Sequence, residues 1–211
     1  SPVLLDEHFR SAYPIIQFSN KEFYGNRIRI MTKDSGADDV LELHHVTEGK
    51  VDSDCTRNMP EVEAVIKRIH ELIADDEGND ENPVSIGIIS PFRGQVDLIQ
   101  KALCQVLTET TIRKHQIEVG TAHTFQGDER DVMILSFAVA DNSFVQSLTF
   151  LQKPNLFNVA ITRARKKLIC FISRNPKTLP QGLLRDYIEY IQQYIDAAKE
   201  DEFRKNTYKN E

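Results

Sequence analysis

The chain has 211 residues, of which 40% are hydrophobic and 27% are charged, a balance typical of one globular domain with a substantial core. Its formal net charge of −6 argues against binding nucleic acid by bulk electrostatics, so we expect any such contact to lie in a groove. No apolar stretch has the length of a membrane span, and the three scattered cysteines suit a reducing cytoplasm.

The predicted elements alternate between strands and helices. In chain order they are an edge strand over 41–46, a helix over 62–73, a strand over 84–89, a helix over 96–106, and strands over 117–120, 132–139 and 168–172. Three of the strands are nearly continuous in apolar character, as strands covered on both faces are. The alternation predicts an α/β fold with a mostly parallel sheet and helices on both faces, in which ligands bind beyond the carboxyl ends of the strands.

Two of the helices carry further signals. The first is opened by Asn58 and Glu61 in a capping-box arrangement, with Pro60 in its first turn. Apolar residues over 184–198 share one face and predict an amphipathic helix that packs on its own sheet. A charged tail is expected from Glu200 onward.

Small polar side chains follow two of the predicted strands. Ser90, Pro91 and Gln95 come after one strand, and Thr121 and His123 come after the next. Hydroxyls, amides and an imidazole at strand ends suit phosphate contacts that position a nucleic-acid strand without reading its sequence. Serine and threonine are also common turn formers, so the residues alone leave both interpretations open.

A polar turn precedes the strand over 132–139. Gly127 permits a sharp turn, and Glu129 could accept hydrogen bonds from ribose hydroxyls or orient a neighbouring arginine. We interpret Asp128 as a solvated acid and Asp131 as a residue that serves the turn.

Two arginines, Arg163 and Arg165, follow an apolar run. We expect both to project from a helix whose other side is apolar. An arginine directed at a γ-phosphate spreads positive charge over the negative charge that develops during phosphoryl transfer, which is worth about 10³–10⁵ in rate in nucleotide hydrolases. The alternative interpretation is a pair of surface arginines on an amphipathic helix.

These segments resemble the motifs of superfamily 1 helicases, the up-frameshift-like branch (superfamily 1B) in particular. Residues 119–131, VGTAHTFQGDERD, resemble motif V, and residues 158–165, NVAITRAR, resemble motif VI. Residues 90–95, SPFRGQ, are similar to motif IV, with serine where threonine is commoner. Phe9 and Arg10 lie in a segment similar to motif IIIa, with phenylalanine where the family most often has tyrosine.

The resemblance implies that residues 1–180 form the C-terminal, second RecA-like lobe of a P-loop NTPase, followed by a helix and tail over 181–211. It implies ATP and Mg²⁺ as cofactors, single-stranded DNA or RNA as partner, and 5′-to-3′ travel. The implied nucleotide contacts are Phe9 on adenine, Arg10 on the γ-phosphate, Arg163 as arginine finger, and Gly127, Glu129 and Arg165. The implied nucleic-acid contacts are Ser90, Pro91, Gln95, Thr121 and His123.

Half of a nucleotide hydrolase site is missing from the sequence. No phosphate-binding loop of the form G-x-x-x-x-G-K-[ST] occurs, nor the strand with paired acids that accompanies it. The resemblance therefore implies that an N-terminal RecA-like lobe of the same protein holds most of the ATP and Mg²⁺, and that this chain alone is inactive. The chain begins within a motif-like segment, as expected of a piece of a longer protein. Its histidines and cysteines have no metal-ligand spacing, so no metal site is predicted.

Two other classes of protein stay open on the sequence. The lobe could belong to a catalytically silent, nucleotide-gated binding module or scaffold attached to another domain, such as a nuclease. It could also be an unrelated α/β nucleotide-binding domain, in which case both arginine-bearing motifs would be coincidental. An intact upstream phosphate-binding loop would favour the motor.

Overall fold

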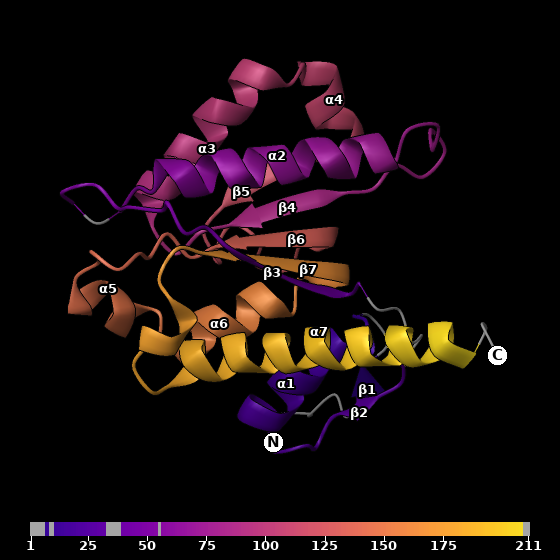
Figure 1. Cartoon of the computed structure of the whole chain (residues 1–211). Coiled ribbons are helices and arrows are strands. Elements are labelled where there is room, and N and C mark those ends of the chain that lie inside the picture. Colours follow the sequence, from indigo (N-terminus) through magenta and orange to yellow (C-terminus); the bar gives the residue numbers. More distant parts are fainter. Residues whose placement is uncertain (1–6, 9–10, 33–38, 55, 209–211) are drawn as a thin grey trace, which may run out of the picture.

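Five parallel strands form one sheet within the described residues of this computed structural model, 7–8, 11–32, 39–54 and 56–208 (Figure 1). In spatial order they are β3 (Leu41–His45), β7 (Ala164–Ile172), β6 (Arg130–Ser136), β4 (Ile86–Ile89) and β5 (Glu118–Gly120). All four pairings are parallel. The prediction of a parallel sheet is confirmed, and β3 lies at its edge as the alternating pattern predicts.

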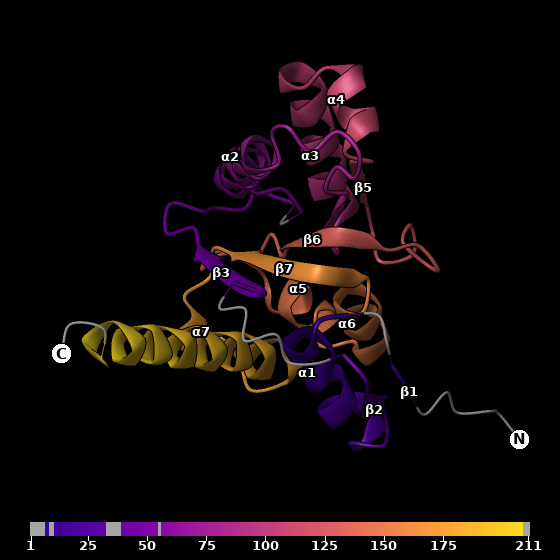
Figure 2. The same ribbon diagram turned by 90° about the vertical axis from the view of Figure 1, so that its right-hand side faces the viewer.

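Helices cover both faces of this sheet (Figures 1 and 2). One face is covered by α2 (Met59–Asp75), α3 (Arg93–Val106) and α4 (Glu109–Lys114). The other face is covered by α1 (Tyr13–Tyr24), α5 (Val145–Phe150), α6 (Pro154–Ile161) and α7 (Leu183–Tyr208). Outside these layers lie a small sheet and a 3₁₀ turn, formed by β1 (Glu7–His8), β2 (Arg29–Ile30) and η1 (Pro176–Thr178). The α/β prediction is confirmed.

The interior strand β7, which lies between β3 and β6, divides its side chains between two cores. Leu168, Cys170 and Ile172 belong to the core on the α1 and α7 side. Ile169 and Phe171 belong to the core on the α2 and α3 side. This alternation follows from the two-residue period of a strand, and burial on both faces explains why the segment reads as a continuous apolar run.

The helix ends agree with the sequence in part. The Asn58 side chain accepts a hydrogen bond from the Glu61 backbone N–H (3.3 Å), which caps α2 as predicted. The Glu61 carboxylate is turned into the protein and does not complete the predicted box. In α7, Leu184 and Ile188 are buried as predicted, but the helix continues to Tyr208 where a tail was expected from Glu200.

Because the strands are parallel, all their starting residues lie at one edge of the sheet and all their last residues at the other. We name them the amino edge (Leu41, Ala164, Arg130, Ile86 and Glu118) and the carboxyl edge (His45, Ile172, Ser136, Ile89 and Gly120). The predicted site residues that the structure describes fall into two groups, one at each edge.

Candidate functional site

The residues expected at a nucleotide gather at the amino edge. The first residues of β6 and β7 are register partners, and the Arg130 backbone N–H donates to the Arg163 carbonyl (3.1 Å). Glu129 and Arg163 therefore precede neighbouring strands at the same edge. Arg165 is the second residue of β7, and Gly127 lies in the turn before β6 with a φ of +88°.

The two arginines do not project from a helix, contrary to the prediction. Helix α6 ends at Ile161, Arg163 lies in the turn that follows, and Arg165 is already in β7. Both the hydroxyl and the backbone N–H of Thr162 donate to the Asn158 carbonyl (2.8 and 3.1 Å) and close the last helical turn. Pairing with β6 then takes over, because tertiary contacts override a local pattern.

Arg163 is half-buried and forms no ion pair with any described residue. Its Nε is buried and has no hydrogen-bond partner among the described residues. A buried donor without a partner costs free energy until another group satisfies it. The neighbouring Arg130 and Arg165 are both ion-paired. Arg163 therefore keeps a positive charge that no described carboxylate neutralises.

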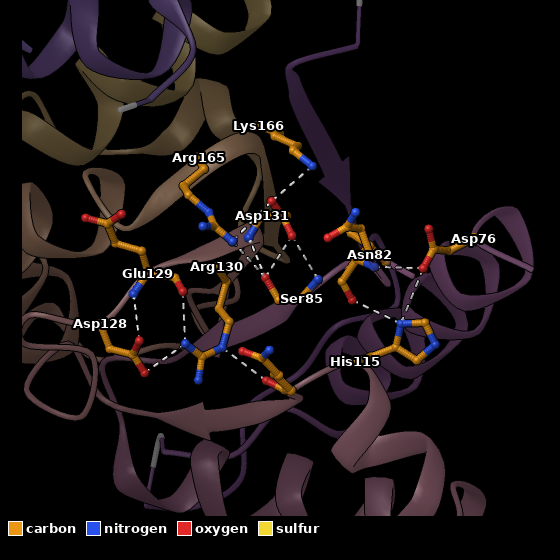
Figure 3. A network of polar contacts seen from close by, with 12 residues as sticks. Asp76, Asn82, Ser85, His115, Asp128, Glu129, Arg130, Asp131, Arg165 and Lys166 are labelled. Atoms are coloured by element: carbon orange, nitrogen blue, oxygen red, sulfur yellow. Dashed lines mark hydrogen bonds and ion pairs between the residues drawn. The ribbon is translucent and has the colours of Figure 1, made fainter. Parts of the chain in front are cut away.

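Arg130, which the sequence did not single out, holds the polar turn before β6 (Figure 3). Its guanidinium is nearly buried and donates from Nη2 to Glu118 (2.7 Å), from Nη1 to the Glu129 carbonyl (2.9 Å) and from Nε to the Gln116 carbonyl (3.0 Å). Nη1 also pairs with Asp128 (2.8 Å), and this contact lowers the pKa of the Asp128 carboxyl. Asp128, expected to be a solvated acid, thus helps to fix the turn.

Asp131 lies within β6 and pairs with two cations of β7. Its Oδ1 is 3.2 Å from Arg165 Nη2 and 3.1 Å from Lys166 Nζ. A surface pocket of about 700 Å³ opens beside Arg165 and Lys166 and is also lined by Arg68 and Leu72 of α2. Asp131 was expected only to serve the turn, but in the structure it also holds Arg165 and Lys166 in ion pairs at this edge.

Phe9 and Arg10 lie outside the described residues. The chain just after them is fixed at the amino edge, because the Ala12 backbone N–H donates to the Arg165 carbonyl (2.8 Å). The Ser11 carbonyl accepts a hydrogen bond from the Thr32 hydroxyl (2.9 Å).

The residues expected at nucleic acid gather at the carboxyl edge, at the opposite ends of the strands. Ser90 follows β4 and Thr121 follows β5, and the Ser90 backbone N–H donates to the Gly120 carbonyl (3.1 Å), so the two loops are adjacent. His123 is exposed, whereas Pro91 and Thr121 are half-buried. An outside molecule can therefore reach three of the five predicted contacts directly.

The other two predicted contacts, Ser90 and Gln95, are fully buried. Gln95 Nε2 donates to Ser136 Oγ (3.0 Å) and to the Asn58 carbonyl (3.3 Å), and its Oε1 accepts from the Asn58 backbone N–H (2.8 Å). These hydrogen bonds occupy the Gln95 side-chain amide with partners inside the protein. Ser90 and Gln95 are thus buried residues on which the loops of the carboxyl edge pack.

The carboxyl group of Glu61, which the sequence predicted only as part of a helix cap, is buried and shares Ser136 Oγ as a partner with Gln95. Glu61 is fully buried, and its Oε1 accepts from Ser136 Oγ (2.7 Å) and from the Ala138 backbone N–H (2.8 Å). Its Oε2 accepts from Ser173 Oγ (2.9 Å) and Asn58 Nδ2 (3.3 Å). Burial raises the pKa of Glu61 to about 7, although the hydrogen bonds from Ala138, Ser136 and Ser173 act to lower it. The network ties the start of α2 to the last residues of β6 and β7.

The two edges are joined by the loop over 121–129, which we name the crossing loop. It leaves β5 at the carboxyl edge and reaches β6 at the amino edge. Phe125 in its middle is fully buried in the core on the α1 and α7 side. The loop is therefore a packed part of the fold that carries His123 at one end and Glu129 at the other.

The chemistry of the amino edge fits an anion. Cationic side chains gather there, and Arg163 has no counter-charge among the described residues. In the described part of the chain, no group of three or more His, Cys, Asp or Glu side chains is placed to hold a metal ion. No described helix is long and apolar enough to cross a bilayer.

Comparison with known proteins relates the chain to helicases. The model of the AAA domain family matches residues 1–175. Helicase SEN1 of Saccharomyces cerevisiae is 27% identical over 207 residues, covering 90% of this chain and 9% of that protein. The uncharacterized ATP-dependent helicase MG140 of Mycoplasma genitalium is 28% identical over 211 residues, covering 90% of this chain and 18% of that protein.

A third relative, a regulator of nonsense transcripts 1 homolog of Neurospora crassa, is 35% identical over 97 residues, covering 46% of this chain and 8% of that protein. The chain thus spans less than a fifth of the length of each of these relatives.

Proposed function

Since the chain belongs to the AAA domain family and is a C-terminal RecA-like lobe of the superfamily 1B helicase type, we propose that it is the second motor lobe of an ATP-dependent helicase or translocase. The amino edge faces a nucleotide that, with Mg²⁺, is held mainly by an N-terminal RecA-like lobe of the same protein. The carboxyl edge contacts single-stranded DNA or RNA.

Arg163 carries this proposal. It is the arginine of the amino edge that has no ion pair with a described residue, and its buried Nε has no hydrogen-bond partner there. A terminal phosphate delivered by the other lobe would supply the missing counter-charge to the half-buried guanidinium. Arg163 would then act as an arginine finger, stabilising the negative charge that develops during phosphoryl transfer.

The other nucleotide contacts surround Arg163. Glu129 and Gly127 lie in the turn before the neighbouring strand, where Glu129 suits hydrogen bonds from a ribose. Arg165 adds a second guanidinium beside it. By resemblance, Phe9 and Arg10 would stack on adenine and contact the γ-phosphate.

At the carboxyl edge, the reachable groups carry the strand contacts. His123, Thr121 and Pro91 would bind or pack against the sugar–phosphate backbone. We assign to the buried Ser90 and Gln95 the support of these loops. Movement of the two lobes around ATP would be passed to the strand through the crossing loop.

The test is Arg163→Ala in the full-length protein. Removing the finger should lower the nucleic-acid-stimulated ATPase by about 10³-fold, because transition-state charge loses its partner. Single-strand affinity, measured by fluorescence anisotropy, should stay within about twofold, since the carboxyl edge is untouched. Arg113→Ala is a matched control, because Arg113 is an exposed arginine whose ion pair with Glu109 lies within α4.

Unchanged turnover of the Arg163 variant would overturn the finger assignment. Nucleotide binding without turnover in the wild-type full-length protein would instead assign the catalytically silent, nucleotide-gated module.

A further inference from the structure

The strand pair β6–β7 contains a bulge at the amino edge. Arg130 pairs with Ala164 and Val132 pairs with Lys167, with a register shift between the two pairs. On β6 one residue, Asp131, lies between these pairs, whereas two residues lie between them on β7. Two residues opposite one define a β-bulge, a feature that redirects side chains and is common next to active sites.

The bulge brings two cations to one carboxylate (Figure 3). In a regular strand, Arg165 and Lys166 would point to opposite faces of the sheet. Here both reach Oδ1 of Asp131, at 3.2 Å from Arg165 and 3.1 Å from Lys166. The extra residue therefore places the Arg165 side chain and that of its neighbour around a single negative charge.

Asp131 itself is held by Ser85, the residue that precedes β4 on its other side. Its Oδ2 accepts hydrogen bonds from the Ser85 backbone N–H (3.1 Å) and hydroxyl (2.9 Å), and the Asp131 backbone N–H donates to the same hydroxyl (2.9 Å). Burial raises the pKa of Asp131, but the hydrogen bonds from Ser85 and Lys166 outweigh it and the net pKa is below its usual range. Asp131 is thus a fixed anion at neutral pH.

Arg165 is held by one end of its guanidinium. Nη2 contacts Asp131 Oδ1 and, at 3.4 Å, Ser85 Oγ, whereas Nε and Nη1 make no hydrogen bond to any described residue. The Arg165 side chain is 44% exposed, and it lines the surface pocket at this edge. A planar guanidinium fixed at one nitrogen presents its remaining donors in a defined direction.

We propose that Asp131, through the bulge, is a positioning residue that orients Arg165 so that its free donors meet the terminal phosphate of a nucleoside triphosphate. The inference rests on the proposed function of the amino edge. The inference gives a positioning role to Asp131, an acid that would itself contact neither the nucleotide nor the nucleic acid.

The geometry also separates this role from a role in stability. An ion pair with a partner as exposed as Arg165 contributes about 0–1 kcal/mol to folding. Orientation matters more for a reacting group, because a displacement of about 1 Å can cost 10²-fold in rate. We therefore expect a substitution at Asp131 to act on the nucleotide more strongly than on the fold.

The experiment compares full-length wild-type protein with Asp131→Asn, Arg165→Ala and the double variant. Affinities for a non-hydrolysable ATP analogue and for ADP are measured by fluorescent-nucleotide titration. Asp131→Asn should weaken the triphosphate about tenfold and leave the diphosphate unchanged, since only the triphosphate offers the terminal phosphate. In the Arg165→Ala background, Asp131→Asn should cause no further loss of triphosphate affinity, because the side chain that Asp131 orients is absent.

Two further variants complete the design. Asp39→Asn removes an exposed acid that pairs with Lys167 at the same end of β7 (2.8 Å), and it should leave both affinities unchanged. Ser85→Ala loosens Asp131 without changing its charge and also removes the 3.4 Å contact between Ser85 Oγ and Arg165, and it should give a smaller loss in the same triphosphate-selective sense. It also serves as the test if Asp131→Asn does not fold.

Equal weakening of triphosphate and diphosphate, or additive losses in the double variant, would overturn the positioning role of Asp131. Such a result leaves the proposed function intact if Arg165→Ala alone selectively weakens the triphosphate. Failure of the proposed function is a separate outcome, recognised by unchanged turnover of Arg163→Ala.

Discussion

At the scale of single residues, two polar groups differ in how well the fold satisfies them. The half-buried Arg163 keeps a buried nitrogen without a partner among the described residues, whereas Glu61 is fully buried and accepts four hydrogen bonds. The first arrangement suits a group that waits for a ligand. The second suits a group that holds chain segments together, here the ends of two strands beside the start of a helix.

The buried Glu61 predicts a pH dependence of stability. Burial raises its pKa from 4.5 to about 7. Below about pH 4.5 the group is protonated in both states, so it makes no difference. As the pH rises from about 4.5 to 7, the Glu61 carboxyl loses its proton in the unfolded chain before it does so in the folded protein. The free energy of unfolding therefore falls, by roughly 3 kcal/mol in total once the pH is above about 7.

Glu61→Gln should remove this fall, because the amide does not titrate. Urea unfolding of the protein between pH 4 and pH 8 measures it, with Glu63→Gln, an exposed position on the same helix, as control. A wild-type protein that loses no stability relative to Glu61→Gln across this range would contradict the assignment.

At the scale of elements, the crossing loop depends on one glycine conformation. Gly127 has a φ of +88°, a backbone region that side chains disfavour, yet a Cβ added there would meet no atom within 4 Å. Gly25, which ends α1 with a φ of +56°, is equally open. The two positions thus share the same kind of strain without a steric clash, while only one lies at the amino edge.

Substituting alanine at either position should therefore cost a similar roughly 1–2 kcal/mol of stability. Gly127→Ala should in addition lower the ATPase of the full-length protein severalfold, because the turn carrying Glu129 shifts. Melting temperatures and steady-state rates of the two variants check this. Equal ATPase rates for Gly127→Ala and Gly25→Ala would show that the turn tolerates the change.

At the scale of the whole molecule, the two groups of predicted contacts occupy opposite edges of one sheet, with a single loop running between them. In the proposed motor, this arrangement separates the nucleotide from the nucleic-acid strand, and the crossing loop connects the two sites directly. Neither edge provides a phosphate-binding loop, because the chain has no G-x-x-x-x-G-K-[ST] segment.

The chain expressed by itself should consequently hydrolyse ATP at no more than background rate at any Mg²⁺ concentration. A coupled assay for phosphate release measures this, and circular dichroism confirms that the sample is folded. Robust turnover by the pure chain would contradict the half-site model.

Much of this protein could be predicted from its sequence. The periodicities indicated the five strands of the main sheet and the helices α2, α3 and α7, because burial on one or both faces determines the spacing of apolar residues. Motif spacing also predicted the turn at Gly127, but the helix expected to carry Arg163 and Arg165 ends at Ile161. The start of β7 was missed, since Ala164 to Lys167 carry no apolar pattern and become a strand only by pairing with β6.

Tertiary structure alone decided how those residues meet. Among the predicted nucleic-acid contacts, Thr121 and His123 are reachable from outside, whereas Ser90 and Gln95 are buried. This difference depends on burial by segments that are distant in the chain. Likewise, the opposition of Asp131 to Arg165 and Lys166 depends on the register between two strands some thirty residues apart. Local patterns fix what each segment becomes, but register and burial are collective properties of the packed sheet, and they exist only once the strands have come together.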